Sequence, residues 1–281
     1  MKQLNLVLFL ITLSSFSCKL LLRSRFTSKI RSEQLPNHAS FSIRGNLQVQ
    51  DVGAAVSDAW VCANNGTILK SSASPVQLIL TNNIKGDCLS VDVDYTGFPW
   101  VVTKTGSVFQ LKQVHENSTY WDEIYKADKG KAIDIGCNQF KSFACYIVIE
   151  NENEPYVFNQ GVFMKSPEFT ANSKIKRIDV GYGVNKEKVF VVNEDNFVLE
   201  LKRNKPPVSL GLIANDLSVG YDNNLYAING NGVYLMTKCS NYFVRIHSLF
   251  AQNIAVGKEL WLVGKDTFVY KGSTNSYVDT C

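Results

Sequence analysis

The chain has 281 residues, of which 45% are hydrophobic, and this is enough for one domain with a substantial core. Its formal net charge is +4, but six of the 29 basic residues and none of the 25 acidic residues fall within residues 1–31. The remainder therefore carries 23 basic and 25 acidic residues, without a basic stripe that would follow a phosphate backbone. This balance disfavours nucleic acid as a partner.

The N-terminus has the pattern of a secretory signal peptide. Lys2 precedes an apolar run from Leu4 to Leu13, and small serines follow at positions 14, 15 and 17. We expect a signal peptide over residues 1–17 and a basic extension over residues 18–38. The run is too short for a membrane-spanning helix, although a signal anchor is the alternative, and no later stretch approaches membrane length. The predicted location is extracellular or in the lumen of the secretory pathway, with no transmembrane segment after cleavage.

Seven cysteines fit an oxidising compartment. Cys18 lies at the predicted cleavage point, and the remaining six permit several pairings. Cys137 and Cys145 flank one short segment and form the best local pair, which leaves Cys62 with Cys88 and Cys239 with Cys281 as candidate disulfides. No paired Cys-x-x-Cys motifs are present, so neither a metal site nor a cofactor is expected.

The same short phrase returns six times: a small or acidic residue, then Val or Ile, then usually Gly. Its third positions are 53, 94, 136, 181, 220 and 257, which gives steps of 41, 42, 45, 39 and 37. Self-similarity at about this period indicates a repeat architecture. The first member of the phrase is Asp51, Asp92, Asp134, Asp179, Ser218 or Ala255.

Each repeat contains four short β-rich pieces and no helical periodicity. The second pieces, each with an aromatic residue, are 59–61, 99–102, 145–148, 189–192, 225–228 and 260–263. The third pieces follow polar turns and span 66–69, 106–109, 155–158, 197–199, 232–235 and 268–270. Weaker fourth pieces occur at 76–79, 121–124, 163–169, 208–210 and 243–246. Turns such as Asn64-Asn65-Gly66 supply the positive φ of tight hairpins.

Six sets of four antiparallel strands predict an all-β fold, a six-bladed β-propeller spanning residues 39–272 with a tail at 273–281. The last repeat lacks its own fourth piece, whereas an extra strand-like segment at 40–43 precedes the first repeat. We expect this N-terminal segment to complete the last blade as its outer strand, because closure removes the open edges of a linear array.

The pattern resembles the tectonin repeat, most clearly in residues 215–235 and 253–271, and the resemblance covers roughly 40–271. Proteins of this family, including fish-egg lectins and the horseshoe-crab lectin tachylectin-1, form six-bladed propellers and bind glycans or bacterial lipopolysaccharide. The resemblance thus implies a carbohydrate-binding, lectin-like protein. Asp94 replaces the usual Gly, and Tyr146 and Phe190 stand where Trp is usual, so the resemblance does not imply equal binding sites in every blade.

The acidic residues Asp51, Asp92, Asp134 and Asp179 are assigned to one equivalent position on the innermost strand. A ring of carboxylates suits a hard cation. The alternative, which we favour, is that each carboxylate accepts backbone N–H groups from a neighbouring strand, since buried carboxylates need partners.

The recurring aromatic residues are predicted to pack between sheets rather than to bind ligands. Trp121, among polar residues on an expected outer strand, is a binding candidate. The polar turns are the other candidates because rigid scaffolds display function on loops, and the alternative is ordinary turn chemistry. The turn candidates are Asn64, Lys104, Glu194, Asp195, Asn229, Asn231, Lys265 and Asp266.

Asn65 and Asn117 each begin an N-glycosylation sequon. No catalytic residue is predicted, because the three histidines lie in no recognisable nucleophile motif. The sequence therefore favours a secreted, non-enzymatic protein that binds surface glycans or lipopolysaccharide through several weak inter-blade or turn sites. The alternative is a structural propeller that binds proteins in an extracellular assembly.

Overall fold

The computed structural model describes residues 39–41, 48–56, 58–71, 78–80, 84, 87–115, 118–140, 145–183, 186–236 and 242–274. The predicted signal peptide and basic extension lie outside these residues, as do Cys18, Cys239, Cys281 and Asn117. No helix within the described residues is long and apolar enough to cross a membrane.

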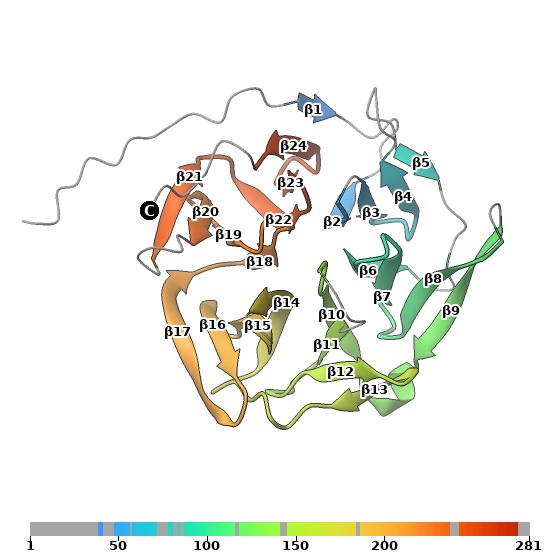
Figure 1. Ribbon diagram of the computed structural model, residues 1–281. Coiled ribbons are helices and arrows are strands. Elements are labelled where there is room, and N and C mark those ends of the chain that lie inside the picture. The colour runs from blue at the N-terminus through green and yellow to red at the C-terminus, as the bar shows by residue number, and fades with distance from the viewer. Residues whose placement is uncertain are drawn as a thin grey trace, which may run out of the picture. The chain divides into compact units, whose positions relative to one another are not determined.

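Six four-stranded antiparallel sheets are arranged around a central axis, which confirms the predicted six-bladed propeller (Figure 1). Blade 1 contains β2 (Val49–Ala54), β3 (Ala59–Ala63), β4 (Ile68–Ser71) and β5 (Leu78–Leu80). Blade 2 contains β6 (Cys88–Val93), β7 (Pro99–Thr103), β8 (Val108–His115) and β9 (Ser118–Tyr125). The short 3₁₀ helix η1 (Ala127–Lys129) leads into blade 3, which contains β10 (Ala132–Cys137), β11 (Cys145–Ile149), β12 (Tyr156–Asn159) and β13 (Val162–Lys165).

The remaining blades repeat this order. Blade 4 contains β14 (Ile175–Gly183), β15 (Lys186–Asn193), β16 (Phe197–Lys202) and β17 (Lys205–Ile213). Blade 5 contains β18 (Asp216–Val219), β19 (Leu225–Asn229), β20 (Gly232–Met236) and β21 (Phe243–His247). Blade 6 contains β22 (Ala251–Val256), β23 (Glu259–Gly264) and β24 (Val269–Ser273), and its fourth strand is β1 (Ala39–Phe41).

The N-terminal strand closes the propeller as expected. β1 pairs antiparallel with β24, with Ala39 opposite Lys271 and Phe41 opposite Val269. An apolar cluster that includes Val52, Trp261 and Val263 also joins blade 6 to blade 1. Hydrogen bonding and packing therefore both connect the first and last blades.

The hydrophobic core is divided among the six junctions between blades. Each of the six apolar clusters combines residues of two neighbouring blades, so every sheet is covered on both faces. All six recurring aromatic residues are buried in these clusters, namely Trp60, Trp100, Tyr146, Phe190, Tyr226 and Trp261. They pack between sheets, as predicted.

Glycine permits the closest approach between innermost strands. A Cβ on Gly136 of β10 would lie 2.4 Å from the carbonyl oxygen of Ile178 and 2.5 Å from the Cα of Asp179 on β14. A Cβ on Gly53 of β2 would similarly lie 2.7 Å from the carbonyl oxygen of Val91 on β6. Both contacts are with backbone, so a larger residue would force the blades apart.

This contact predicts the effect of replacing Gly136. Gly136→Ala is expected to lower the free energy of unfolding by about 2 kcal/mol, because overpacking displaces blade 4 from blade 3. Gly230→Ala is the matched control, since no atom lies within 4 Å of its added Cβ, and it should change stability little. Urea denaturation measures both variants, and equal stabilities would contradict the close-packing argument.

Candidate functional site: the central channel and an inter-blade cleft

The innermost strands line a central channel with two rings of side chains. The pairing of the first and second strands defines these rings. In each blade, one residue of the innermost strand lies opposite the recurring aromatic residue of the second strand. The second ring contains these opposite residues, which are Gly53, Asp92, Gly136, Asp179, Ser218 and Ala255. The first ring lies two residues earlier and contains Asp51, Ser90, Asp134, Arg177, Asp216 and Asn253.

The prediction of one equivalent position for the four aspartates is therefore wrong. Asp51 and Asp134 belong to the first ring, whereas Asp92 and Asp179 belong to the second. The Asp-Val-Gly phrase occurs in two registers that differ by two residues. In blades 1 and 3 its Gly occupies the second ring, where the neighbouring backbone leaves no room for a Cβ.

The preferred role for these carboxylates, accepting backbone N–H groups from the next blade, is what the geometry shows. In the first ring, Asp51 accepts from Val91 at 2.9 Å, Asp134 from Ile178 at 2.8 Å and Asp216 from Ile254 at 3.0 Å. In the second ring, Asp92 accepts from Cys137 and Asp179 from Val219, both at 2.6 Å, and the Ser218 hydroxyl accepts from Val256 at 3.1 Å. Each bond joins one blade to the next, from blade 1 through to blade 6.

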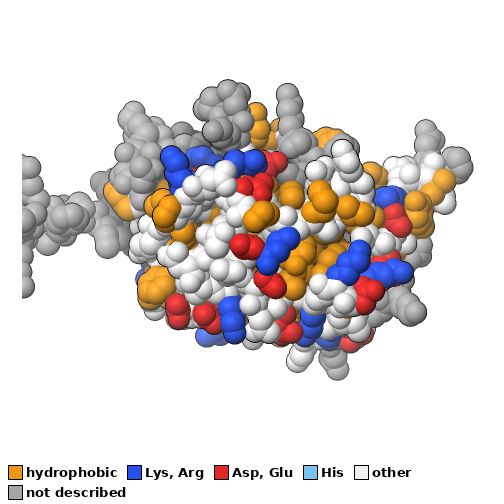
Figure 2. All heavy atoms as spheres, turned by 90° about the horizontal axis from the view of Figure 1, so that it is seen from below, with side chains coloured by type: hydrophobic (Ala, Val, Ile, Leu, Met, Phe, Trp, Pro, Cys, Tyr) orange, Lys and Arg blue, Asp and Glu red, His pale blue; other side chains and the backbone are white. Residues whose placement is uncertain are grey.

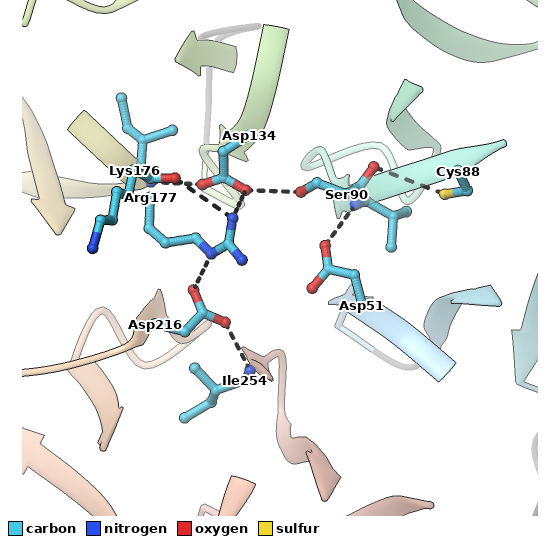
Figure 3. Close-up of polar contacts among 10 residues, drawn as sticks. Asp51, Cys88, Ser90, Asp134, Lys176, Arg177, Asp216 and Ile254 are labelled. Carbon is cyan, nitrogen blue, oxygen red and sulfur yellow. Dashed lines mark hydrogen bonds and ion pairs between the residues drawn. The ribbon is translucent and has the colours of Figure 1, made fainter. Parts of the chain in front are cut away.

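Arg177 is the cation of the first ring (Figure 3). Its Nη1 lies 3.7 Å from Asp134 Oδ1, and its Nε lies 3.6 Å from Asp216 Oδ1. The Ser90 hydroxyl donates to the same Asp134 oxygen at 2.8 Å. The guanidinium thus connects the carboxylates of Asp134 in blade 3 and Asp216 in blade 5. A carboxylate at position 177 would instead repel both of them.

Burial governs the acid–base behaviour of the channel. It raises the pKa of Asp51 to about 6 and that of Asp179 to about 7, and it raises the pKa of Asp134 as well. Arg177 opposes this effect at Asp51 and Asp134. For Arg177 itself, burial lowers the pKa but the surrounding carboxylates raise it by more, so the guanidinium stays charged.

The chemistry of this channel is that of a structural network. The hollow between the rings has a volume of only about 30 Å³, and its polar atoms are those already bonded between blades. Within the described residues, no group of three or more His, Cys, Asp or Glu side chains is arranged to hold a metal ion.

Gln139 of blade 3, close to a disulfide, reaches across the axis. Cys137 and Cys145 form the predicted local disulfide, and Cys62 and Cys88 form the predicted bond between blades 1 and 2. Between the first pair, the Gln139 side-chain amide donates to the carbonyl oxygens of Ala54 at 2.9 Å and Val256 at 3.1 Å. Gln139 therefore ties blade 3 to blades 1 and 6 at one end of the channel.

The predicted turn residues all lie on one face of the propeller, where the second strand of each blade turns into the third. We call it the 2–3 turn face, and the face where the first strand turns into the second the 1–2 turn face. The same backbone contact recurs on the 2–3 turn face: the N–H groups of Asn64, Lys104, Glu194 and Lys265 donate to the residue preceding the first strand of their blade.

Two of these side chains already serve their own turns. Asn229 accepts from the Asn231 N–H at 2.8 Å, and Asp266 accepts from the Phe268 N–H at 3.1 Å. Lys104 and Asn64 are brought together, because the Lys104 ammonium donates to the Asn64 carbonyl oxygen at 2.9 Å. Glu194, Asp195 and Lys265 are exposed in separate turns, so the structure distributes the candidates around a ring rather than into one pocket.

Two other sequence candidates have clear positions. Trp121 lies on the outer strand β9, half-buried against the apolar cluster between blades 1 and 2. Asn65 is exposed in the turn of blade 1, where its side-chain oxygen accepts from the Thr67 N–H at 3.1 Å.

An open cleft of about 780 Å³ lies between blades 2, 3 and 4 on the 1–2 turn face. Lys112 of β8 contributes one wall, Phe158 and Gln160 at the β12–β13 turn a second, and Glu187 and Arg203 of blade 4 a third. Figure 2 shows the molecule from the side of β12, β13 and β17, where hydrophobic side chains lie between basic and acidic ones.

Polar groups in the cleft are held in defined orientations. The Tyr146 hydroxyl donates to Glu187 Oε2 at 2.6 Å, and burial together with this bond raises the pKa of Tyr146. Arg203 Nη1 lies 3.6 Å from Glu168 Oε1, and its guanidinium stacks 5.4 Å from the Phe169 ring centre. The walls thus combine aromatic surface with oriented hydrogen-bonding groups, which is typical of a ligand site.

Sequence reasoning did not single out Arg177, Asp216 or the cleft. Aligning the repeats on the aromatic residue of the second strand, rather than on the Asp-Val-Gly phrase, would have placed Arg177 and Asp216 in the first ring. The cleft depends on side chains from three blades, and no spacing within a single repeat indicates it.

No protein-family model matches the sequence, and a search of curated proteins finds no match. Solved structures do match by fold. A structure described as the putative gluconolactonase has a TM-score of 0.62 at 10% identity and covers 85% of this chain and 93% of its own. Streptogramin B lyase has a TM-score of 0.56 at 12% identity and covers 84% of this chain and 87% of its own. The structure described as YCF48 bound to D1 peptide has a TM-score of 0.53 at 12% identity and covers 87% of this chain and 85% of its own. At such identities these likenesses establish the propeller fold alone.

The raised pKa values predict how stability depends on pH. A carboxyl with a higher pKa in the folded state contributes stability at low pH, and that contribution is lost as pH rises through the folded pKa. The free energy of unfolding should therefore fall between about pH 4 and pH 7 for Asp51 and Asp179. Asp51→Asn keeps an acceptor for Val91 and should reduce this fall by as much as about 3 kcal/mol. Denaturation across that pH range measures it, and parallel profiles for both proteins would contradict the assignment.

Proposed function

We propose that this propeller is a secreted, non-enzymatic protein that binds carbohydrate in the cleft between blades 2, 3 and 4. The cleft itself carries the proposal. Its lining combines Phe158, whose half-buried ring packs against Trp100 and Phe163, with the oriented polar groups of Glu187 and Arg203. Sugars present apolar C–H faces and hydroxyl groups that both donate and accept hydrogen bonds, so this combination suits them.

Two further observations support the extracellular setting and the choice of the cleft. The disulfides Cys62–Cys88 and Cys137–Cys145 are characteristic of an oxidising compartment. Asn229 and Asp266 spend side-chain hydrogen bonds within their own 2–3 turns, and the turn candidates are distributed around a ring, whereas the cleft has open volume. The likeness to tectonin-repeat lectins agrees with this function, although no family match supports it.

A glycan and lipopolysaccharide array probed with the purified protein tests the proposal. Arg203→Ala, which removes exposed donors from the cleft, should weaken binding about tenfold. Lys265→Ala, an exposed cation on the 2–3 turn face, is the matched control and should bind normally. If only Lys265→Ala lost glycan binding, the binding site would lie in the 2–3 turns rather than in the cleft. An array without signal would contradict carbohydrate binding.

A protein-binding propeller is the second candidate, because a similar fold, YCF48, is described with a bound peptide. The cleft also has the apolar surface that a peptide would bury. Affinity capture from secreted protein mixtures distinguishes the two functions. A stable complex that excess sugar does not disrupt, together with a silent array, would favour the protein-binding role.

Catalysis is the alternative raised by the likeness to streptogramin B lyase and to the putative gluconolactonase. We propose binding without turnover, because the channel carboxylates are committed to backbone N–H groups and to Arg177. Bound glycans should be recovered unchanged after prolonged incubation. Product formation that Asp134→Asn abolishes in a folded protein would overturn this.

A further inference from the structure

Tyr182, an exposed aromatic residue on the 1–2 turn face, lies next to a residue that lines the cleft. Tyr182 of β14 lies opposite Glu187 of β15 in the antiparallel register of blade 4. Cross-strand partners project from the same face of a sheet, with Cβ atoms about 5 Å apart. Glu187 contacts Tyr146 of blade 3 at the cleft wall, so Tyr182 stands on the same side, next to that wall.

The backbone of Tyr182 is held in place, while the residue remains 39% exposed. The Asn223 side chain of blade 5 accepts from the Tyr182 N–H at 2.8 Å and also donates to the Tyr182 carbonyl oxygen. This two-sided contact fixes the backbone that carries the ring. A pre-positioned aromatic surface loses little conformational freedom when a ligand binds.

The charges of the cleft indicate the kind of ligand that fits. The lining contains two basic residues, Lys112 and Arg203, and two acidic residues, Glu168 and Glu187. Three of these groups already pair locally: Lys112 with Asp122, and Arg203 with Glu168. A strongly anionic chain gains no net attraction here, whereas a neutral ligand with many hydroxyl groups is accommodated.

We infer that the ligand of this cleft is an uncharged oligosaccharide of at least two units, one bound inside the cleft and the next stacked on Tyr182 at its mouth. This inference rests on the proposed carbohydrate binding and adds a second contact to it. Stacking of a sugar face on the Tyr182 ring gives a gain that only the longer chain obtains.

Calorimetric titration with neutral oligosaccharides of glucose, mannose and N-acetylglucosamine, from monomer to hexamer, tests the inference, with a sulfated oligosaccharide as the anionic comparison. The wild-type protein should bind the dimer or trimer more tightly than the monomer and should bind the sulfated chain more weakly. Tyr182→Ala should leave monomer affinity unchanged and lose about tenfold in affinity for the longer chains. Tyr182→Trp should retain the dependence on length.

Phe268→Ala is the matched control, because Phe268 is 45% exposed on the 2–3 turn face. It should behave like the wild type. Binding that does not depend on chain length, or an equal profile for Tyr182→Ala, would overturn the second contact while leaving carbohydrate binding in place. Preference for the sulfated chain would contradict the inference that the ligand is uncharged. Absence of binding to every chain would contradict both this inference and the proposed carbohydrate binding.

Discussion

The propeller depends on the capture of backbone N–H groups by polar side chains across the boundary between neighbouring innermost strands. The inward edge of each innermost strand has no neighbouring strand in its own sheet. Its backbone groups would therefore be buried without hydrogen-bond partners if no side chain reached them. Asp51, Asp134 and Asp216 satisfy them from the first ring, and Asp92, Asp179 and Ser218 from the second. The bonds place several carboxylates near one axis, and Arg177 reduces the resulting repulsion.

The fold could be predicted from the sequence because its signals are repeated and additive. A period near 40 residues, an aromatic residue in each second piece and polar turns all specify blades, and the extra N-terminal strand specifies closure. The local disulfide followed from proximity in the chain. Each of these features is set by residues close in sequence or by the counting of repeats.

The sites were less predictable because they depend on register and on contacts between blades. A shift of two residues keeps a side chain on the same face of a strand but moves it along the axis, so Asp51 and Asp92 looked equivalent although they lie in different rings. Asp94 shows the same limit. Where a glycine was expected, its carboxylate accepts from the Trp100 indole at 2.9 Å, a contact that the repeat pattern alone does not reveal. The cleft combines three blades, which no single repeat encodes.

The pairing of β1 with β24 has a consequence for how this chain is made. Ala39 leaves the ribosome long before its partner Lys271, because more than 200 residues separate them in the sequence. Blade 6 cannot complete its sheet until β24 has been translated, and the outer edge of β24 has no partner until β1 pairs with it. Pairing over so long a sequence separation is slow, and an unpaired edge invites association with other chains. Biogenesis, more than the finished molecule, is therefore the stage at which this propeller is most exposed to misassembly.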